Sequence, residues 1–212
     1  AIWHEEILAK VPSPAHTEVF TNRATGRLDI VVACQERMAP TDDLIGSVVL
    51  LGNEREMRFT PVTILTNVPR VASVEPGDFN NDGQIDFVVA AFGHIKAGEI
   101  GWIEQKDGAF SYETILKRAG AIRAIPIEIN GDKFLDFIAL FGQEHEQICA
   151  FFNNANGTFF EAPLFKAATP SFGSSGIELV DLDQDGDFDI LYTNGDNMDL
   201  NTRIPRPYHG VQ

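Results

Sequence analysis

The chain has 212 residues, of which 44% are hydrophobic, and its 31 acidic side chains against 16 basic ones give a formal net charge of -15 at pH 7. A chain of this size and composition can bury a sizeable core, and we assign residues 1–212 to a single globular domain. The acidic excess argues against nucleic-acid binding, because a phosphate backbone needs a basic face. No run of about 18 apolar residues predicts a membrane span.

One pattern recurs four times along the chain: an apolar strand, a polar loop, and an apolar residue followed by an aspartate that opens a second apolar strand. The closing aspartates are 57, 50 and 53 residues apart. They are Asp29, Asp86, Asp136 and Asp189. A period of this length, filled with short strands, is typical of β-propeller blades. The sequence therefore predicts an all-β propeller with about four four-stranded blades.

Within each period the pattern predicts four strands, and the second repeat shows them most clearly. The second strands, such as 87–92, are apolar on both faces, as expected for a strand between neighbouring blades. Pro61 and Pro163 interrupt fourth strands, and proline belongs on an edge because it cannot donate a ladder hydrogen bond. Cys34 and Cys149 are predicted to be buried strand residues without a disulfide. The predicted strands of the second repeat are 71–75, 87–92, 99–104 and 110–116.

The two ends of the chain fall inside a blade. Residues 2–9 resemble a fourth strand, whereas the chain stops at 209–212, where a third strand should begin. Two arrangements follow from this phasing. Either the N-terminal strand completes the last blade and closes a four-bladed ring, or the chain is a segment of a larger propeller whose further blades or partner chain complete it.

The loops of repeats two and four fit the spacing Asp-x-(Asp/Asn)-x-Asp-Gly-x-x-Asp. Alternate side chains of such a loop direct oxygens to one point, while glycine takes a positive-φ turn, so the loops predict Ca²⁺ sites. The alternative is that these residues form Asx turns that cap their own backbone. The predicted ligands are Asp78, Asn80, Asp82, Asp86, Asp181, Asp183, Asp185 and Asp189.

The other two loops depart from this spacing. Repeat three keeps a weaker set of candidate ligands, with Lys133 at the glycine position. These candidates are Glu128, Asn130, Asp132 and Asp136. Repeat one has Thr21, Arg23 and Thr25 where ligands should be, and no ion is expected there.

These loops, followed by Phe-Val-Val-Ala at 87–90 or Phe-Asp-Ile-Leu-Tyr at 188–192, resemble the FG-GAP/VCBS repeats of integrin-α heads and of many secreted bacterial propellers. The resemblance covers nearly the whole chain. It implies calcium held between first and second strands, with ligands or substrates met on the opposite face. The fold serves adhesion, scaffolding and, in some fungal dehydratases, catalysis, so it does not fix a function.

The loops that join second to third strands, and fourth strands to the next blade, should emerge on the face opposite the acidic loops. Histidine and arginine on this face could hold a carboxylate, phosphate or sugar, and Glu144 with His145 could transfer protons or bind a metal. The alternative is that these polar loops only solvate the face. The candidate ligand-binding residues are His94, Arg118 and Arg123, and the candidate catalytic residues are Glu144 and His145.

The sequence thus predicts a calcium-stabilised binding or scaffold module of a secreted, periplasmic or otherwise extracellular protein. Its expected partner is a protein, a carbohydrate or another small polar ligand. Extracellular calcium modules bind their ion at about 10⁻⁴–10⁻³ M, which is why the predicted loops favour this location. The alternative function is a lyase or hydrolase that acts on a sugar or a similar polar metabolite at the face opposite the calcium loops.

Overall fold

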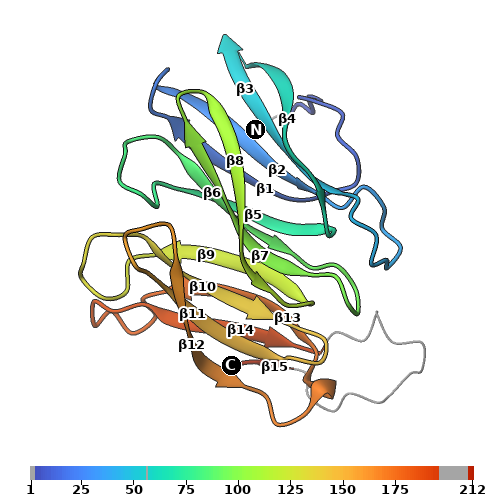
Figure 1. Cartoon of the computed structure of the whole chain (residues 1–212), viewed down its shortest axis with the longest axis vertical. Coiled ribbons are helices and arrows are strands. Elements are labelled where there is room, and N and C mark those ends of the chain that lie inside the picture. The colour runs from blue at the N-terminus through green and yellow to red at the C-terminus, as the bar shows by residue number, and fades with distance from the viewer. Residues whose placement is uncertain (1–2, 56, 196–209) are drawn as a thin grey trace.

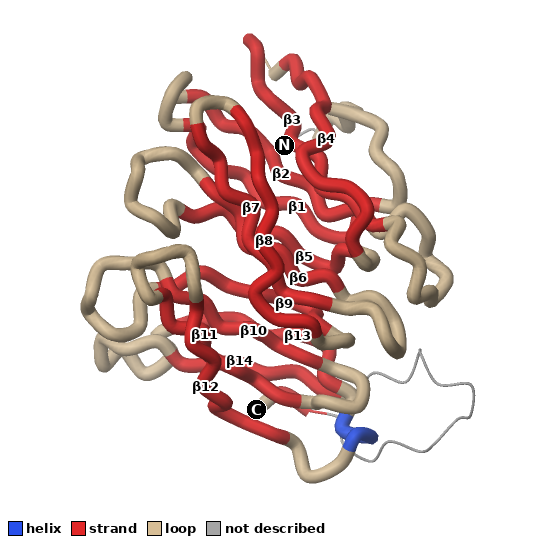
Figure 2. Tube along the Cα trace, viewed as in Figure 1, coloured by secondary structure: helices blue, strands red, loops and turns tan. Residues whose placement is uncertain are grey.

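The structure is a computed structural model that describes residues 3–55, 57–195 and 210–212. Four antiparallel sheets follow one another around a common axis and form a four-bladed β-propeller (Figures 1 and 2). Blade 1 contains β1 (Pro14–Asn22), β2 (Arg27–Cys34), β3 (Gly46–Arg55) and β4 (Arg58–Val68). Blade 2 contains β5 (Val71–Gly77), β6 (Asp86–Ala91), β7 (Glu99–Lys106) and β8 (Ala109–Lys117). The all-β propeller predicted from the repeats is confirmed.

The second half of the chain repeats this order. Blade 3 contains β9 (Ala121–Ile127), β10 (Asp136–Phe141), β11 (Gln147–Asn153) and β12 (Phe159–Lys166). Blade 4 contains β13 (Ser174–Val180), β14 (Asp189–Asn194) and β15 (Gly210–Val211), and a short 3₁₀ helix, Pro170–Phe172, precedes it. In the described part of the chain, no helix is long and apolar enough to cross a membrane.

Strand order within a blade explains the burial of each strand. The second strands β6 and β10 are buried along their whole length because neighbouring blades cover both of their faces. The fourth strands are largely exposed, and Pro61 and Pro163 lie in two of them, β4 and β12, which are the outer edges of their sheets. Cys34 and Cys149 are buried, free thiols, as predicted.

Apolar clusters between adjacent blades form the core. Blades 1 and 2 share one cluster around Val31 and Phe87, and blades 3 and 4 share another around Leu140 and Tyr192. Blades 2 and 3 share a third cluster, in which Phe137 and Phe151 of blade 3 stack with 4.6 Å between ring centroids. Phe137 is fully buried. Each such side chain contributes about 1.5–3 kcal/mol through burial alone. Packing between sheets therefore holds the blades at fixed positions around the axis.

The two ends of the chain take different roles from those predicted. Residues 3–12 form no strand; instead Ala9 and Val11 pack against the cluster that contains Val32 and Cys34 in blade 1. The prediction of a fourth strand at 2–9 is wrong for the described residues 3–9, and residue 2 lies outside them. The C-terminal β15 does begin a third strand, as predicted, and pairs with β14. Apolar burial on blade 1 thus replaces the predicted strand pairing of the N-terminal residues.

Candidate functional site

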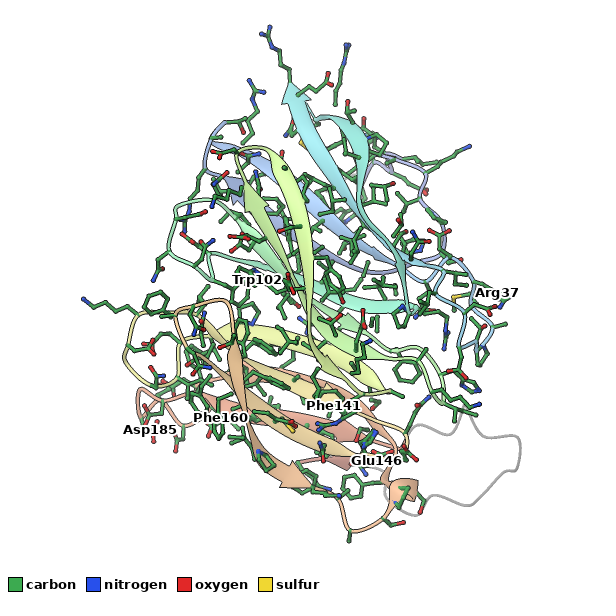
Figure 3. All side chains as sticks on the ribbon, viewed as in Figure 1. Arg37, Trp102, Phe141, Glu146, Phe160 and Asp185 are labelled. Carbon is green, nitrogen blue, oxygen red and sulfur yellow. The ribbon has the colours of Figure 1, made fainter. Side chains whose placement is uncertain are left out.

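The acidic loops lie on one side of the propeller, at the turns between first and second strands. Asp185 marks this side in Figure 3, and Glu146 and Arg37 mark the opposite side. Three of these loops share one backbone shape, with left-handed residues at the fourth and sixth positions. These residues are Asn81 and Gly83, Gly131 and Lys133, and Gln184 and Gly186. Lys133, at φ 75°, thus adopts the conformation that the pattern assigns to glycine.

The loop of blade 4 gathers its carboxylates most tightly. Oxygens of Asp181, Asp183 and Asp189 all lie within 4.8 Å of one another. Asp185 stands apart from this group: its carboxylate accepts the Asp187 N–H at 3.0 Å, and its own N–H donates to Asp181 and Asp183. Because a hard cation needs several oxygens around one point, three of the four predicted ligands fit Ca²⁺ in this loop.

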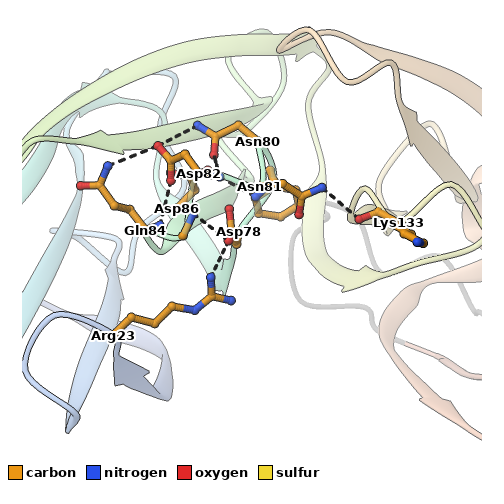
Figure 4. Close-up of polar contacts among 10 residues, drawn as sticks. Arg23, Asp78, Asn80, Asn81, Asp82, Gln84, Asp86 and Lys133 are labelled. Carbon is orange, nitrogen blue, oxygen red and sulfur yellow. Dashed lines mark hydrogen bonds and ion pairs between the residues drawn. The ribbon is translucent and has the colours of Figure 1, made fainter.

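The loop of blade 2 is arranged differently, because a cation from blade 1 reaches it. Arg23 Nη1 donates a hydrogen bond of 2.5 Å to Asp78 Oδ2 (Figure 4). The other oxygen of Asp78, Oδ1, is buried and accepts no hydrogen bond. Asn80 donates to Asp82 at 3.3 Å and to Glu104 at 3.1 Å. The guanidinium of Arg23 therefore already neutralises the first predicted ligand of this loop.

The loop of blade 3 forms a network of turn hydrogen bonds. Glu128 accepts the Gly131 N–H at 2.5 Å, and Asp132 accepts the Phe134 N–H at 2.8 Å. Asn130 donates to Asp132 at 3.0 Å, so these side chains satisfy one another and the local backbone. This arrangement is the one expected for Asx turns.

The closing aspartates have a structural role that the sequence reasoning missed. Asp86 accepts the Phe79 N–H of its own loop and the Gln105 N–H of the third strand, and Asp136 accepts the corresponding N–H groups of Ile129 and Asn153. Asp29 also accepts a third-strand N–H, that of Asn53. Each carboxylate thus ties its loop to the sheet. Repeat one carried a sequence signal for this tethering role, because it keeps the closing Asp29 although it lacks the other acidic residues of the loop.

These tethers are buried, and burial affects their protonation. Desolvation raises the pKa of Asp86 to about 6, although the N–H groups of Gln105 and Phe79 lower it. Desolvation also raises the pKa of Asp136. Asp189 differs from both: it is exposed, it accepts the Leu182 N–H, and within the described residues no third-strand N–H donates to it. Its carboxylate is therefore the most accessible of the four to an ion.

On the opposite face, three of the five candidate residues lie close together. Arg118 forms two hydrogen bonds with Glu161, at 2.5 and 3.1 Å, and its guanidinium lies 4.8 Å from the centre of the Phe141 ring. His145 Nε2 lies 3.5 Å from Glu144 Oε1. Burial, and then the charge of Arg118, lower the pKa of His145. These contacts form a polar group on blade 3.

His94 and Arg123 belong to two other groups. His94 precedes a loop whose three N–H groups, those of residues 95–97, donate to Asp42 Oδ1 at 2.8–2.9 Å. Asp42 belongs to blade 1, so this contact joins the loops of two blades. Arg123, on the first strand β9, lies beside acidic side chains of the first strands β1, β5 and β13. The described contacts therefore place the five candidate residues in three contact groups.

The group around Arg123 contains residues that the sequence reasoning did not select as candidates. Arg123 Nη2 lies 3.2 Å from Glu75 Oε1 and 3.8 Å from Glu18 Oε1, and Nη1 lies 3.7 Å from Glu178 Oε1. His16 Nε2 lies 3.3 Å from Glu18 Oε1 and 3.5 Å from Glu75 Oε1. A signal existed in the sequence, since glutamates interrupt first strands that the blade pattern places nearest the axis.

Comparison with known families gives one match. The family model described as FG-GAP-like repeat matches residues 24–89 and 128–192, together more than half of the chain. The chain belongs to the FG-GAP repeat family. Each matched span begins at one loop between a first and second strand and ends in the second strand of the next blade. Each match therefore covers strands of two neighbouring blades, β2–β6 in one case and β10–β14 in the other. No curated protein matches the chain.

Proposed function

We propose that this FG-GAP repeat propeller is a calcium-stabilised binding or scaffold module of a secreted, periplasmic or otherwise extracellular protein. The observation that carries the proposal is the convergence of Asp181, Asp183 and Asp189 on an exposed loop, where their described hydrogen bonds involve no basic side chain. Gathered carboxylates repel one another, and a divalent cation relieves that repulsion. The ion would add stability only to the folded chain.

The two acidic loops are proposed to differ in affinity. In the loop at 78–86 an ion would have to compete with Arg23 for Asp78, whereas the loop at 181–189 has no such competitor among the described contacts. We therefore assign the tighter site to the loop of blade 4 and a weaker one to that of blade 2. The turn network of Glu128, Asn130 and Asp132 supports the turn interpretation for blade 3.

The proposed extracellular location rests on ion supply. Exposed loop sites of this kind bind Ca²⁺ at about 10⁻⁴–10⁻³ M in extracellular modules, a range that cytosolic calcium does not reach. The proposed partner is a protein, a carbohydrate or a small polar ligand that meets the face opposite the loops. Binding is favoured over turnover because Glu161 already neutralises Arg118, and the side chain of Glu144 is largely exposed.

The test compares two charge-matched variants of one loop. Asp183→Ala removes a proposed ligand, whereas Asp187→Ala removes the same charge from a position outside the convergent group. With wild type, Ca²⁺ at ten times its Kd should add about 1.4 kcal/mol to the free energy of unfolding. Asp187→Ala should keep this gain and Asp183→Ala should lose it, as measured by thermal melting with Ca²⁺ and with chelator. Identical melting of wild type under both conditions would refute the proposal.

A further inference from the structure

The axis of the propeller holds a second cluster of ligating side chains, separate from the calcium loops. The first strands β1, β5, β9 and β13 are in contact in that order around the axis. They contribute His16 and Glu18, Glu75, Arg123, and Glu178 respectively. Four blades thus direct charged side chains to one place, although first strands otherwise carry apolar residues between the sheets.

Carboxyl groups outnumber guanidinium groups in this cluster. Three carboxyl groups face a single guanidinium, that of Arg123, which lies within 4 Å of all three. Glu75 is only 6% exposed, and its Oε1 accepts no hydrogen bond even though Arg123 Nη2 is 3.2 Å away. A buried carboxylate oxygen without a hydrogen bond is costly. Glu75 Oε1 is therefore a deeply buried acceptor that faces His16 and Arg123 without a hydrogen bond.

We propose that the axis binds a divalent transition-metal cation, Zn²⁺ or a cation of similar chemistry, through His16 Nε2, Glu18 Oε1 and Glu75 Oε1. Tetrahedral zinc with bonds of about 2.0–2.1 Å needs ligand atoms about 3.3 Å apart. His16 Nε2 lies 3.3 Å from Glu18 Oε1 and 3.5 Å from Glu75 Oε1, and all three atoms lie within 4.8 Å of one another. Two edges of the triangle already have the required length.

Arg123 occupies the neighbourhood of the proposed ion and competes with it. A divalent cation brings twice its charge to the same carboxylates, and Arg123 has an alternative partner in Glu178, 3.7 Å from Nη1. Imidazole nitrogen with carboxylate oxygen selects zinc and its neighbours over calcium, which takes oxygen ligands. The axial site should therefore stay distinct from the loop sites when both ions are present. Three protein ligands leave one position of a tetrahedral ion open.

The experiment is a Zn²⁺ titration of the full, metal-stripped chain by calorimetry, in buffer with excess Ca²⁺ to occupy the acidic loops. We expect one Zn²⁺ per chain at the axis. His16→Gln and Glu75→Gln should each weaken its binding by more than about tenfold, since even outer-shell changes cost roughly that much. His94→Gln removes a histidine outside the cluster and should leave the Kd unchanged. No Zn²⁺ binding, or equal Kd values in His16→Gln and His94→Gln, would overturn the proposal.

A second variant keeps the proposal testable where a ligand variant fails to fold. Arg123→Met removes the competing cation but keeps a long, apolar side chain, so it should tighten Zn²⁺ binding. Circular dichroism without metal verifies that each variant is folded. Substitution with Co²⁺ gives an independent readout, because its visible absorption should appear in wild type and Arg123→Met and be lost in Glu75→Gln. Unchanged or weaker Zn²⁺ binding in Arg123→Met would contradict the competition and refute the assigned ligand set.

Discussion

Arg23 illustrates how a single side chain can modify a site in a neighbouring blade. It belongs to the loop of repeat one, which lacks the acidic spacing, yet its guanidinium contacts the first predicted ligand of repeat two, Asp78. The sequence placed the two residues 55 positions apart, in separate repeats. Only the packing of β1 against β5 brings their loops together. Ligand spacing could be predicted from the sequence, but the competing cation could not.

Replacing Arg23 should therefore change calcium binding in the loop of blade 2. Arg23→Gln frees Asp78, and we expect a several-fold increase in Ca²⁺ affinity at 78–86, larger at low ionic strength, because salt screens this half-exposed ion pair. Arg27→Gln is the matched control, since Arg27 begins β2 just after this loop and donates instead to the Asn53 carbonyl. Calorimetric titration with Ca²⁺ measures both. Equal affinities in the two variants would show that Arg23 does not compete with the ion.

The closing aspartates lead to a prediction that does not involve calcium. Asp29→Asn removes one carboxylate oxygen that accepts a hydrogen bond from Asn53 N–H or the Asn22 side chain. A buried donor left unpaired costs about 1–3 kcal/mol, so the variant should unfold at lower urea concentration. Because no ion is expected in this loop, the loss should be the same with Ca²⁺ and with chelator. Exposed Asp107→Asn serves as the control, and a calcium-dependent loss in Asp29→Asn would contradict the tether.

At the scale of the element, strand positions could be predicted closely. The expected strands 71–75, 87–92, 99–104 and 110–116 compare with Val71–Gly77, Asp86–Ala91, Glu99–Lys106 and Ala109–Lys117. Local pattern suffices here because a strand covered on both faces must be apolar throughout. The N-terminal residues show the limit of that reasoning. Their pattern matched a fourth strand, but the outer face of blade 1 offered apolar burial, and tertiary packing decided their conformation.

Packing between elements can be tested with two phenylalanines of blade 3. Phe137, on β10, is fully buried between blades and stacks on Phe151, whereas Phe160, on β12, is 62% exposed (Figure 3). Phe137→Ala should lower the free energy of unfolding by about 3–5 kcal/mol, through lost burial and the cavity left behind. Phe160→Ala should change it little, as expected of an exposed position. Urea unfolding of both variants measures the difference, and similar losses would show that contacts between blades do not dominate stability.

At the scale of the whole molecule, the propeller joins its blades at two levels. Apolar clusters hold adjacent sheets together, and the charged group around Arg123 connects all four first strands at the axis. The repeat period was enough to predict the blades and the side on which the acidic loops emerge. The axial group was harder to predict, because its members come from four separate repeats and differ in residue type. Its geometry depends on how blades are rotated about the axis, which no single repeat encodes.

The N-terminal segment supplies the last test, because it covers blade 1 in place of another sheet. Val11 packs beside Cys34, and Ile7 is 73% exposed. Val11→Asp should detach the segment and uncover Cys34, whereas Ile7→Asp should leave it in place. Uncovered apolar surface should also favour self-association, which light scattering after gel filtration measures.

Cys34 reports this detachment directly. Burial raises the pKa of the Cys34 thiol to about 11 and that of Cys149 to about 12, so both stay protonated at neutral pH and should resist a thiol-specific disulfide reagent in the folded chain. Because these pKa values are higher in the folded state, stability should fall as pH rises above the ordinary thiol pKa of 9.0. Val11→Asp should make one thiol reactive, Cys34, while Cys149, between blades 2 and 3, remains protected as an internal control. If both thiols react together, Val11→Asp has unfolded the molecule globally; if neither reacts, the segment does not protect blade 1.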